Sequence, residues 1–449
     1  MIKREKVLDA LNKILSQCEA DQADCVLINF EQSLTRFANN FIHQNVNQSN
    51  TRLFVRAIRD GRIGVATTNR LDASALNDVC KRAIQIADVS PKREGFKSLP
   101  KPKPISKITT HFKSTANFDA LARAEKVKKF CNKAKKLGMT ASGSFSIYEG
   151  EIAVANSLGI KAYQPLTLAL VALITSHAPN VSGYGSGISR DVDKIDFDSI
   201  LETAIKKCEL ARNPKPIKPG EYRVILEPEA VANLFEWINY IGFGAKSILE
   251  KTSFLDRRIG KKIFSSSLTI YDDGCDTANV AIPFDFEGVP KKKTMIVERG
   301  VGKGVVYDSY YGKLAKREST GHALTPDETA GPLAFNLLIA PGKSSLGEMV
   351  QTCEQGIFVT RFHYINGYLD TRNAVLTGMT RDGTYLVKDG KIKHALLNLR
   401  FTQNMLEALS RVEMLGSEQK SVPSWWEEIG AMRCPAMRLA KFNFTGATR

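Results

Sequence analysis

The segment "ANLFEWINYIGFG" (residues 232–244) places a single carboxylate among apolar and aromatic side chains. A Glu in such surroundings can have a raised pKa and act as a general base, as the Glu of zinc peptidases does when it activates a metal-bound water. That arrangement needs metal ligands on the same helix, and "LFEWINYI" supplies no His, Cys or Asp. Glu236 by itself is therefore more typical of a helix-surface or interface carboxylate than of a catalytic one.

Two histidines and two acidic segments are the other candidates for chemistry. His363 in "TRFHYING" and His322 in "ESTGHAL" are expected in loops, where either could act as an acid or base near neutral pH. A single His without a nucleophile or an orienting carboxylate is more often a surface or packing residue. The acidic pairs in "YDDG" (271–274) and "PFDFEG" (283–288) could bind a hard cation, but isolated pairs in turns usually bond their own backbone.

The sequence contains none of the common local motifs for metals, phosphates or nucleophiles. The eight cysteines and six histidines are scattered singly, without a C-x-x-C or a His pair within two helical turns. No nucleophile elbow, P-loop or EF-hand loop is present. We therefore expect reduced, mostly buried thiols, no bound cofactor and no metal.

Composition and charge indicate a globular protein with a basic surface. A length of 449 residues predicts two domains, with three as an alternative, and 43% hydrophobic with 24% charged residues is typical of a soluble protein. No apolar run approaches the roughly 18 residues that span a bilayer, and the start "MIKREKVLDALNKIL" does not resemble a signal peptide. We therefore expect a cytoplasmic location and no membrane partner.

The net charge of +16 raises the question of a nucleic-acid partner. The Lys and Arg residues are spread along the chain, and no zinc knuckle, basic zipper or aromatic RNA-binding signature accompanies them. A generally basic, solvated surface is the favoured interpretation, with a basic nucleic-acid-associated protein kept as an alternative.

Hydrophobic periodicity predicts an α+β chain with two domains. In the first half it predicts a helix over 3–17, antiparallel strands broken by a turn at Asp60-Gly61, and a helix capped by Asp72 that runs to about 87. Helices over about 118–137 and 195–212 flank two further strands, and the tract "SGYGSG" (182–187) is predicted to be a flexible turn.

The second half is expected to be mainly β, as a barrel or curved sheet. A Pro/Lys/Gly break at 213–219 is taken as the linker between an N-terminal α+β domain (1–212) and this C-terminal domain (220–449). Pro228 marks the start of a helix that contains Glu236. Short β-prone runs separated by Gly, Asp and Pro follow it: "SLTIYDDG", "TMIVERGVG", "AFNLLIAPG", "GIFVTRF" and "GTYLVKDGKI".

Several segments, in order and over most of the chain, resemble the TldD/PmbA family, whose members were named as modulators of DNA gyrase and are related to peptidases. These segments are "RDGRIGVATTNRLDASAL" (59–76), "EIAVANSLGI" (151–160), "SFLDRRIGKKI" (253–263), "FDFEGVPKKKTMIVERGVGKG" (284–304), "ESTGHAL" (318–324) and "NLLIAPGKSSLGEMV" (336–350).

The resemblance implies a zinc motif that this chain lacks. TldD-type members carry an H-E-x-x-x-H helix and a distant cysteine, and the matching helix here is 228–244. One register places Glu236 and Ile241 at the two histidines with Trp237 at the glutamate; a register shifted by one places Phe235 and Tyr240 there with Glu236 at the glutamate. Leu415, in "MLGSEQKSVP" (414–423), takes the place of the cysteine.

The chain therefore looks like the PmbA/TldE side of the family, a metal-free subunit that pairs with a TldD-type zinc peptidase. The resemblance implies a heterodimer or larger assembly, with a homodimer as the alternative, around an extended or unfolded peptide, and a subunit that is not catalytic by itself. A hydrolase with a different site, built around His322 or His363 and nearby carboxylates, is the alternative from the enzyme class.

Overall fold

The computed structural model describes residues 4–179, 181–426 and 429–447, which form two large sheets with helices around them. The first sheet is antiparallel with six strands in the order β3-β2-β1-β4-β5-β6. Asp60 and Gly61 form the β2–β3 turn with positive φ angles of 49° and 75°, as the sequence predicted. The strands are β1 (Gln22–Ala38), β2 (Phe41–Arg59), β3 (Arg62–Thr68), β4 (Thr140–Asn156), β5 (Lys161–Ala178) and β6 (Val181–Ser189).

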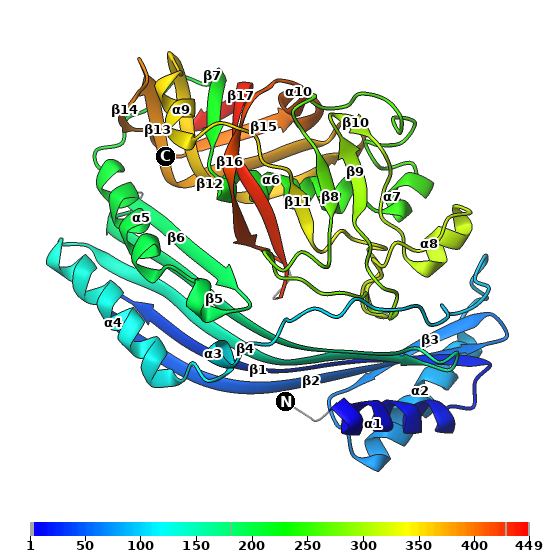
Figure 1. The fold of residues 1–449 in the computed structure, drawn as a ribbon. Helices are drawn as coiled ribbons and strands as arrows, with labels where there is room; N and C mark the ends of the chain where they lie inside the picture. Colours follow the sequence, from blue (N-terminus) through cyan, green and yellow to red (C-terminus); the bar gives the residue numbers. More distant parts are fainter. Residues whose placement is uncertain (1–3, 180, 427–428, 448–449) are drawn as a thin grey trace.

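Helices cover one face of this sheet in two groups. At one end α1 and α2 pack on the strands, and at the other α4 and α5 do so (Figure 1). Asp72 caps α2 by accepting the N–H of Ala75 at 3.1 Å, which confirms the predicted helix start. The helical segments are α1 (Arg4–Gln17), α2 (Ala73–Val89), α3 (Lys113–Ala116), α4 (Ala120–Lys136), the 3-10 turn η1 (Val192–Lys194) and α5 (Phe197–Leu210).

The other face of the first sheet packs against the C-terminal half of the chain, which lies above the sheet in Figure 1. Side chains alternate between the faces: Cys25 and Leu27 lie in the core beneath α1 and α2, whereas Val26 and Ile28 lie in a second core with Phe284. This two-sided burial explains why "CVLI" is continuously apolar rather than alternating.

The prediction of a flexible turn at "SGYGSG" was wrong, because this tract lies within strand β6. Its glycines let α5 approach the strand directly. A Cβ on Gly183 would lie 2.1 Å from the carbonyl oxygen of Ala204, and one on Gly185 would lie 2.4 Å from that of Ile200. The glycine signal therefore reports close helix-to-strand packing, not chain flexibility.

The second sheet has eleven strands, and five of them close into a ring. Strands β17, β15, β13, β12 and β7 are neighbours in that order, and β7 also pairs with β17. The barrel-like or curved C-terminal sheet and the α+β class were thus predicted correctly. The strands are β7 (Gly220–Leu226), β8 (Ile270–Asp272), β9 (Thr294–Glu298), β10 (Val301–Gly302), β11 (Leu337–Ile339), β12 (Gln355–Asp370), β13 (Val375–Lys388), β14 (Lys391–Ala395), β15 (Leu399–Asn404), β16 (Val412–Pro423) and β17 (Ala431–Ala447).

Short helices connect these strands, and one longer helix fills their core. Residues of α6 share a continuous apolar core with strands β7, β12, β15 and β17. The division of the chain at 213–219 stays a prediction. The helical segments of this half are α6 (Pro228–Gly242), α7 (Ala245–Leu249), α8 (Ser309–Leu314), α9 (Leu346–Gln351), the 3-10 turn η2 (Thr371–Asn373) and α10 (Met405–Ser410).

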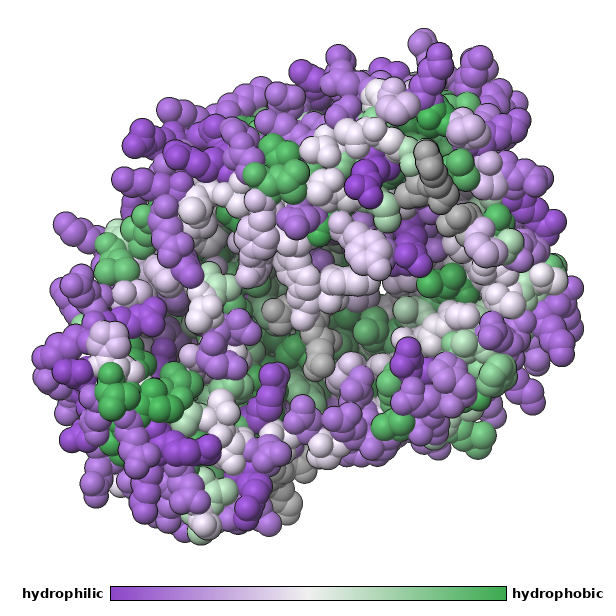
Figure 2. All heavy atoms as spheres, turned by 180° about the vertical axis from the view of Figure 1, so that it is seen from behind, coloured by the Kyte–Doolittle hydropathy of each residue, from purple (hydrophilic) through white to green (hydrophobic). Residues whose placement is uncertain are grey.

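The surface is largely hydrophilic, and the face shown in Figure 2 is hollowed near its middle, where hydrophobic side chains lie inside a hydrophilic rim. Within the described part of the chain, no helix is long and apolar enough to cross a membrane. All eight cysteines are free, and seven of them are buried, in agreement with the expected reduced thiols.

Candidate functional site

Helix α6 is the element that positions Glu236. Pro228 occupies its first turn, where the missing N–H costs nothing. The apolar side of the helix is buried, with Leu234, Phe235, Ile238 and Ile241 each at most 4% exposed. These four side chains recur at helical spacing and anchor α6 in the barrel core. Glu236 therefore sits on a helix whose orientation is fixed by packing.

The Glu236 carboxylate binds the loop that follows β16. Its Oε1 accepts a hydrogen bond from the Ser424 hydroxyl at 2.5 Å and another from the Trp425 backbone N–H at 2.7 Å. No Lys, Arg or His of the described residues forms an ion pair with it. Burial raises the pKa of Glu236, and the hydrogen bonds from the Ser424 hydroxyl and the backbone N–H groups of Trp425 and Trp426 only partly oppose this.

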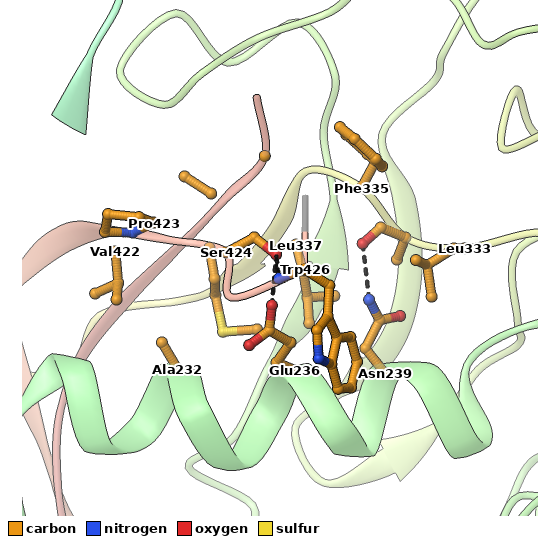
Figure 3. Close-up of a pocket in the computed structure, with 14 residues that line it drawn as sticks. Ala232, Glu236, Asn239, Leu333, Phe335, Leu337, Val422, Pro423, Ser424 and Trp426 are labelled. Carbon is orange, nitrogen blue, oxygen red and sulfur yellow. Dashed lines mark hydrogen bonds between the residues drawn. The ribbon is translucent and has the colours of Figure 1, made fainter. Parts of the chain in front are cut away.

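A small pocket, here called the Glu236 pocket, lies between α6, the segment 333–337 and the segments 422–426 and 430–432. Glu236 and Asn239 enter it from the same side of α6, and Trp426 lies beside both (Figure 3). The amide nitrogen of Asn239 donates to the carbonyl oxygen of Ala334 at 2.9 Å. Its Oδ1 is buried and has no hydrogen-bond partner in the described structure. The Asn239 oxygen is thus an acceptor without a donor in the pocket lining.

An aromatic cluster borders this pocket. Trp237 makes edge contacts with Trp426 and Tyr368, at centroid distances of 4.8 and 5.5 Å, and Tyr240 contacts the same two rings. Tyr240, Tyr368 and Trp426 are 36%, 61% and 39% exposed, so the cluster forms part of the surface. Trp237 packs against the barrel core as well as against these partly exposed rings.

His322 is not in a loop cleft but inside the protein. Its side chain is fully buried, with Nε2 at 2.9 Å from Asp272 and Nδ1 at 2.9 Å from Thr320. Burial lowers the pKa of His322, and Asp272 opposes this only in part. Lys291 donates a hydrogen bond to the Asn336 side-chain oxygen at 2.8 Å, and the Asn336 backbone N–H donates to Asp272. Asp272 thus joins Lys291, Asn336 and His322 in one buried network. Such a network supports the core and offers no access to a substrate.

His363 lies elsewhere, on β12, where its ring packs against Tyr364 and Trp425 at 4.0 and 5.4 Å. Strands β11, β17 and β7 separate β12 from β8, the strand that carries the His322 partner Asp272. The two histidines therefore lie in different parts of the C-terminal half, so a hydrolase site could not use both.

The acidic segments serve turns and ion pairs. Asp273 accepts the N–H of Cys275 at 3.0 Å, and Asp285 accepts three backbone N–H groups, from Glu287, Val289 and Ala323. The turn interpretation of "YDDG" and "PFDFEG" is thus the correct one for these aspartates. Glu287 instead reaches Arg56 on β2 at 3.3 Å, a contact between the two halves of the chain.

Two family models match the chain. The model for the "PmbA/TldA metallopeptidase domain 1" matches residues 23–87, and that for the "PmbA/TldA metallopeptidase C-terminal domain" matches residues 219–446, half of the chain by itself. The chain belongs to the TldD/PmbA family. The family is related to metallopeptidases of the TldD/TldE type.

Individual TldD/PmbA proteins are similar over most of the chain. A metalloprotease TldD homologue of Buchnera aphidicola is 25% identical over 408 residues, which cover 85% of this chain and 82% of that protein. The crystal structure of TldE from Thermococcus kodakarensis has the same fold, with a TM-score of 0.85 at 23% identity over 98% of this chain and 99% of that one. A Thermotoga maritima structure described as a candidate modulator of a DNA gyrase gives a TM-score of 0.83 at 17% identity, covering 97% and 99%.

The TldD-type zinc motif does not fit the residues present here. In one register a histidine position falls on Ile241, which is 4% exposed, and in the other the two positions fall on Phe235 and Tyr240, which are 1% and 36% exposed; Leu415 is 4% exposed in the barrel core. Hydrocarbon side chains have no lone pair for zinc, and Glu236 would be the sole ligand in its register. No group of three or more His, Cys, Asp or Glu in the described ranges is placed to hold a metal.

The sequence drew attention to Glu236 but missed the residues that surround it. Ser424, Trp425 and Trp426 lie some 190 positions later, in a loop without a recognisable motif. Asn239 carried a local signal, because it lies three residues after Glu236 on one predicted helix. The pocket itself depends on where the β16–β17 connection lies over α6, which periodicity does not encode.

Proposed function

We propose that this protein is the metal-free, PmbA/TldE-like subunit of a TldD/TldE-type peptidase assembly. It takes part in the proteolysis or maturation of extended or unfolded peptides through substrate handling and assembly, without zinc chemistry of its own. Its partner is a TldD-type zinc peptidase subunit, in a heterodimer or larger complex, with a homodimer as the alternative.

A single observation carries this proposal: the helix at the place of the zinc motif holds hydrophobic side chains where ligands are needed. Phe235 and Ile241 anchor α6 in the core, and Leu415 packs in that core as well. Placing three zinc ligands there would require replacing core residues with polar ones, at a cost of several kcal/mol. The similarity to the fold of the T. kodakarensis TldE supports the same assignment.

A handling role needs a surface that can contact a peptide without cleaving it. The partly exposed aromatic cluster combines Trp237 and Tyr240 of α6 with Tyr368 of β12 and Trp426, which follows β16. Exposed aromatic side chains are enriched in binding surfaces because they bury a large area at a low cost in conformational entropy.

Metal analysis and peptide cleavage test the proposal. The purified chain is expected to hold much less than one zinc per molecule after dialysis against micromolar zinc, and to leave an unfolded fluorogenic peptide intact with or without a chelator. Mixing it with a TldD-type protein from the same cell should give a stable complex in size-exclusion chromatography, with chelator-sensitive cleavage. Stoichiometric zinc or chelator-sensitive cleavage by this chain alone would refute the proposal.

A further inference from the structure

The Glu236 pocket has a chemical character that structural packing does not explain. Glu236 lines it with a carboxylate that has no cationic partner in the described structure and that interacts with the Ser424 hydroxyl and the backbone N–H groups of Trp425 and Trp426. A carboxylate offers about four lone-pair positions, so these three donors leave capacity for a further one. The buried Asn239 Oδ1, also in the pocket lining, accepts no hydrogen bond.

The orientation of the Asn239 amide is fixed by its neighbour. Its nitrogen donates to the carbonyl oxygen of Ala334 at 2.9 Å, and a flipped amide would place two acceptors against each other. The oxygen is therefore the atom left unpaired. A buried acceptor without a partner is unfavourable, so a bound donor would recover free energy.

The shape and walls of the pocket narrow the choice of ligand. Its volume of about 40 Å³ is roughly three times what one water needs, which suits a group of two or three heavy atoms. Phe335 and Trp426 contribute aromatic walls, which attract cations through the ring quadrupole. A small cation with several N–H donors matches the charge of the carboxylate and the aromatic walls, and Asn239 adds an unpaired acceptor to the lining.

We propose that the Glu236 pocket binds a primary ammonium group. The group is either the end of a lysine side chain or the amino terminus of a peptide, which share the same chemistry. The Glu236 carboxylate supplies the charge complement and Asn239 a further acceptor. The peptide source of the ammonium rests on the proposed substrate-handling role, whereas binding of the group itself does not.

The protein carries its own reporter for this binding. Its three tryptophans are Trp237, Trp425 and Trp426. Trp426 lines the pocket, and the Trp237 ring contacts the Trp426 ring at a centroid distance of 4.8 Å. The Trp425 backbone N–H donates a hydrogen bond to Glu236 at 2.7 Å. All of the intrinsic tryptophan fluorescence therefore originates around this site. The net charge of +16 opposes non-specific attraction of cations, which makes a saturable response more diagnostic.

Titration of the purified full chain with propylammonium at pH 8 is the primary test, with tryptophan fluorescence as the readout. A saturable change is expected with propylammonium, and a response at least tenfold weaker with 1-propanol, tetramethylammonium or KCl at equal concentration. Equal responses to propylammonium and 1-propanol would overturn the proposal. An equal response to KCl would indicate a site for simple cations and would also overturn it.

Three variants connect the response to the carboxylate. Glu236→Gln keeps an oxygen for Ser424 and Trp425 but removes the charge, so propylammonium should bind at least tenfold more weakly at an unchanged melting temperature. Glu418→Gln, which removes an exposed charge from β16, should bind as the wild type does. Ser424→Ala removes a hydrogen bond that positions the Glu236 carboxylate and should weaken binding, but less than Glu236→Gln does. Unchanged binding by Glu236→Gln would refute the proposal; if that variant unfolds, the 1-propanol comparison decides.

Two peptides distinguish the sources of the ammonium group. Acetyl-Ala-Ala-Lys-Ala-amide carries only the lysine amine, and Ala-Ala-Gln-Ala-amide carries only the amino terminus. The peptide that competes with propylammonium identifies the source, and competition by neither would overturn the peptide part of the inference. If neither peptide competes, the proposal of a metal-free subunit is unaffected, because zinc content and peptide cleavage test it separately. If the chain binds zinc, the propylammonium titration remains a valid test of the ammonium site.

Discussion

At the scale of single residues, Asp308 shows how burial changes a titration in this fold. It caps α8 by accepting the N–H of Tyr311 at 2.6 Å. Burial and the nearby charge of Glu287 raise the pKa of Asp308 to about 7. The same carboxyl titrates near about 3.9 in an unfolded chain. Because the pKa of Asp308 is higher in the folded chain than in the unfolded chain, the protonated carboxyl stabilises the fold. This contribution is complete below the pKa of the unfolded chain and is lost as pH rises through about 7.

Asp308→Asn should therefore change the pH dependence of stability. Asn keeps an oxygen for the cap and does not titrate. We expect wild type and variant to unfold at similar denaturant concentrations at pH 4, and the variant to be more stable by about 1–3 kcal/mol at pH 8. Chemical denaturation at the two pH values measures this difference.

Asp72→Asn provides the matched control, because Asp72 also caps a helix but is exposed. The Ala75 N–H and Arg70 hold its pKa below the usual value, against the small opposing effect of burial. The ionised Asp72 carboxylate therefore contributes to stability at neutral pH, and this contribution is lost as pH falls. Asp72→Asn should accordingly gain no stability at pH 8. A similar gain in both variants would show that the effect comes from the cap and not from the titration.

At the scale of elements, α5 and β6 show how glycine sets the distance between a helix and a strand. The strand presents Gly183 and Gly185 to the helix, where added Cβ atoms would meet backbone carbonyl oxygens at 2.1 and 2.4 Å. Backbone cannot move aside as a flexible side chain can. The Thr175 hydroxyl also donates to the Ala204 carbonyl at 2.8 Å, which holds this turn of α5 against the neighbouring strand.

Gly183→Ala should destabilise the protein by about 1–3 kcal/mol, because α5 must move outward or the strand must bend. Gly446→Ala on β17 is the control, since its added Cβ would have no atom within 4 Å. We expect this second change to be neutral or slightly stabilising. Urea denaturation compares the two variants, and equal midpoints would contradict the close-packing explanation.

At the scale of the whole molecule, Arg56 links the first sheet to a turn in the C-terminal half of the chain. On β2 it makes hydrogen bonds of 2.9 and 2.6 Å to Asp24 on β1, and it reaches Glu287 in the C-terminal half at 3.3 Å. The Asp24 and Glu287 side chains are 2% and 6% exposed. Removing the cation would leave two buried carboxylates without compensation, which is the costly way to break an ion pair.

Arg56→Met should therefore cost about 3–5 kcal/mol and increase hydrogen exchange in β1, β2 and the 283–290 segment. Arg59→Met, on the same strand, breaks a pair with Asp88 in which the side chains are 45% and 48% exposed. Its expected cost is below about 1 kcal/mol. Similar small effects of both changes, measured by denaturation and hydrogen exchange, would show that Arg56 does not hold the first sheet to this turn.

The sequence by itself determined the local elements and the chemistry that α6 lacks. The Asp60-Gly61 hairpin, the Asp72 cap and the start of α6 at Pro228 follow from backbone preferences and hydrogen bonds within a few residues. The missing zinc ligands were also visible, because a side chain without a lone pair cannot acquire one through folding.

Only the tertiary structure decided how distant residues meet. It buried His322 with Asp272, separated it from His363, and placed Ser424 and Trp426 over Glu236. It also turned "SGYGSG" from an expected turn into a strand beneath α5. These outcomes depend on contacts between residues far apart in the chain, and local propensity and periodicity carry no information about such contacts. Glu236 became the carboxylate of a pocket for the same reason.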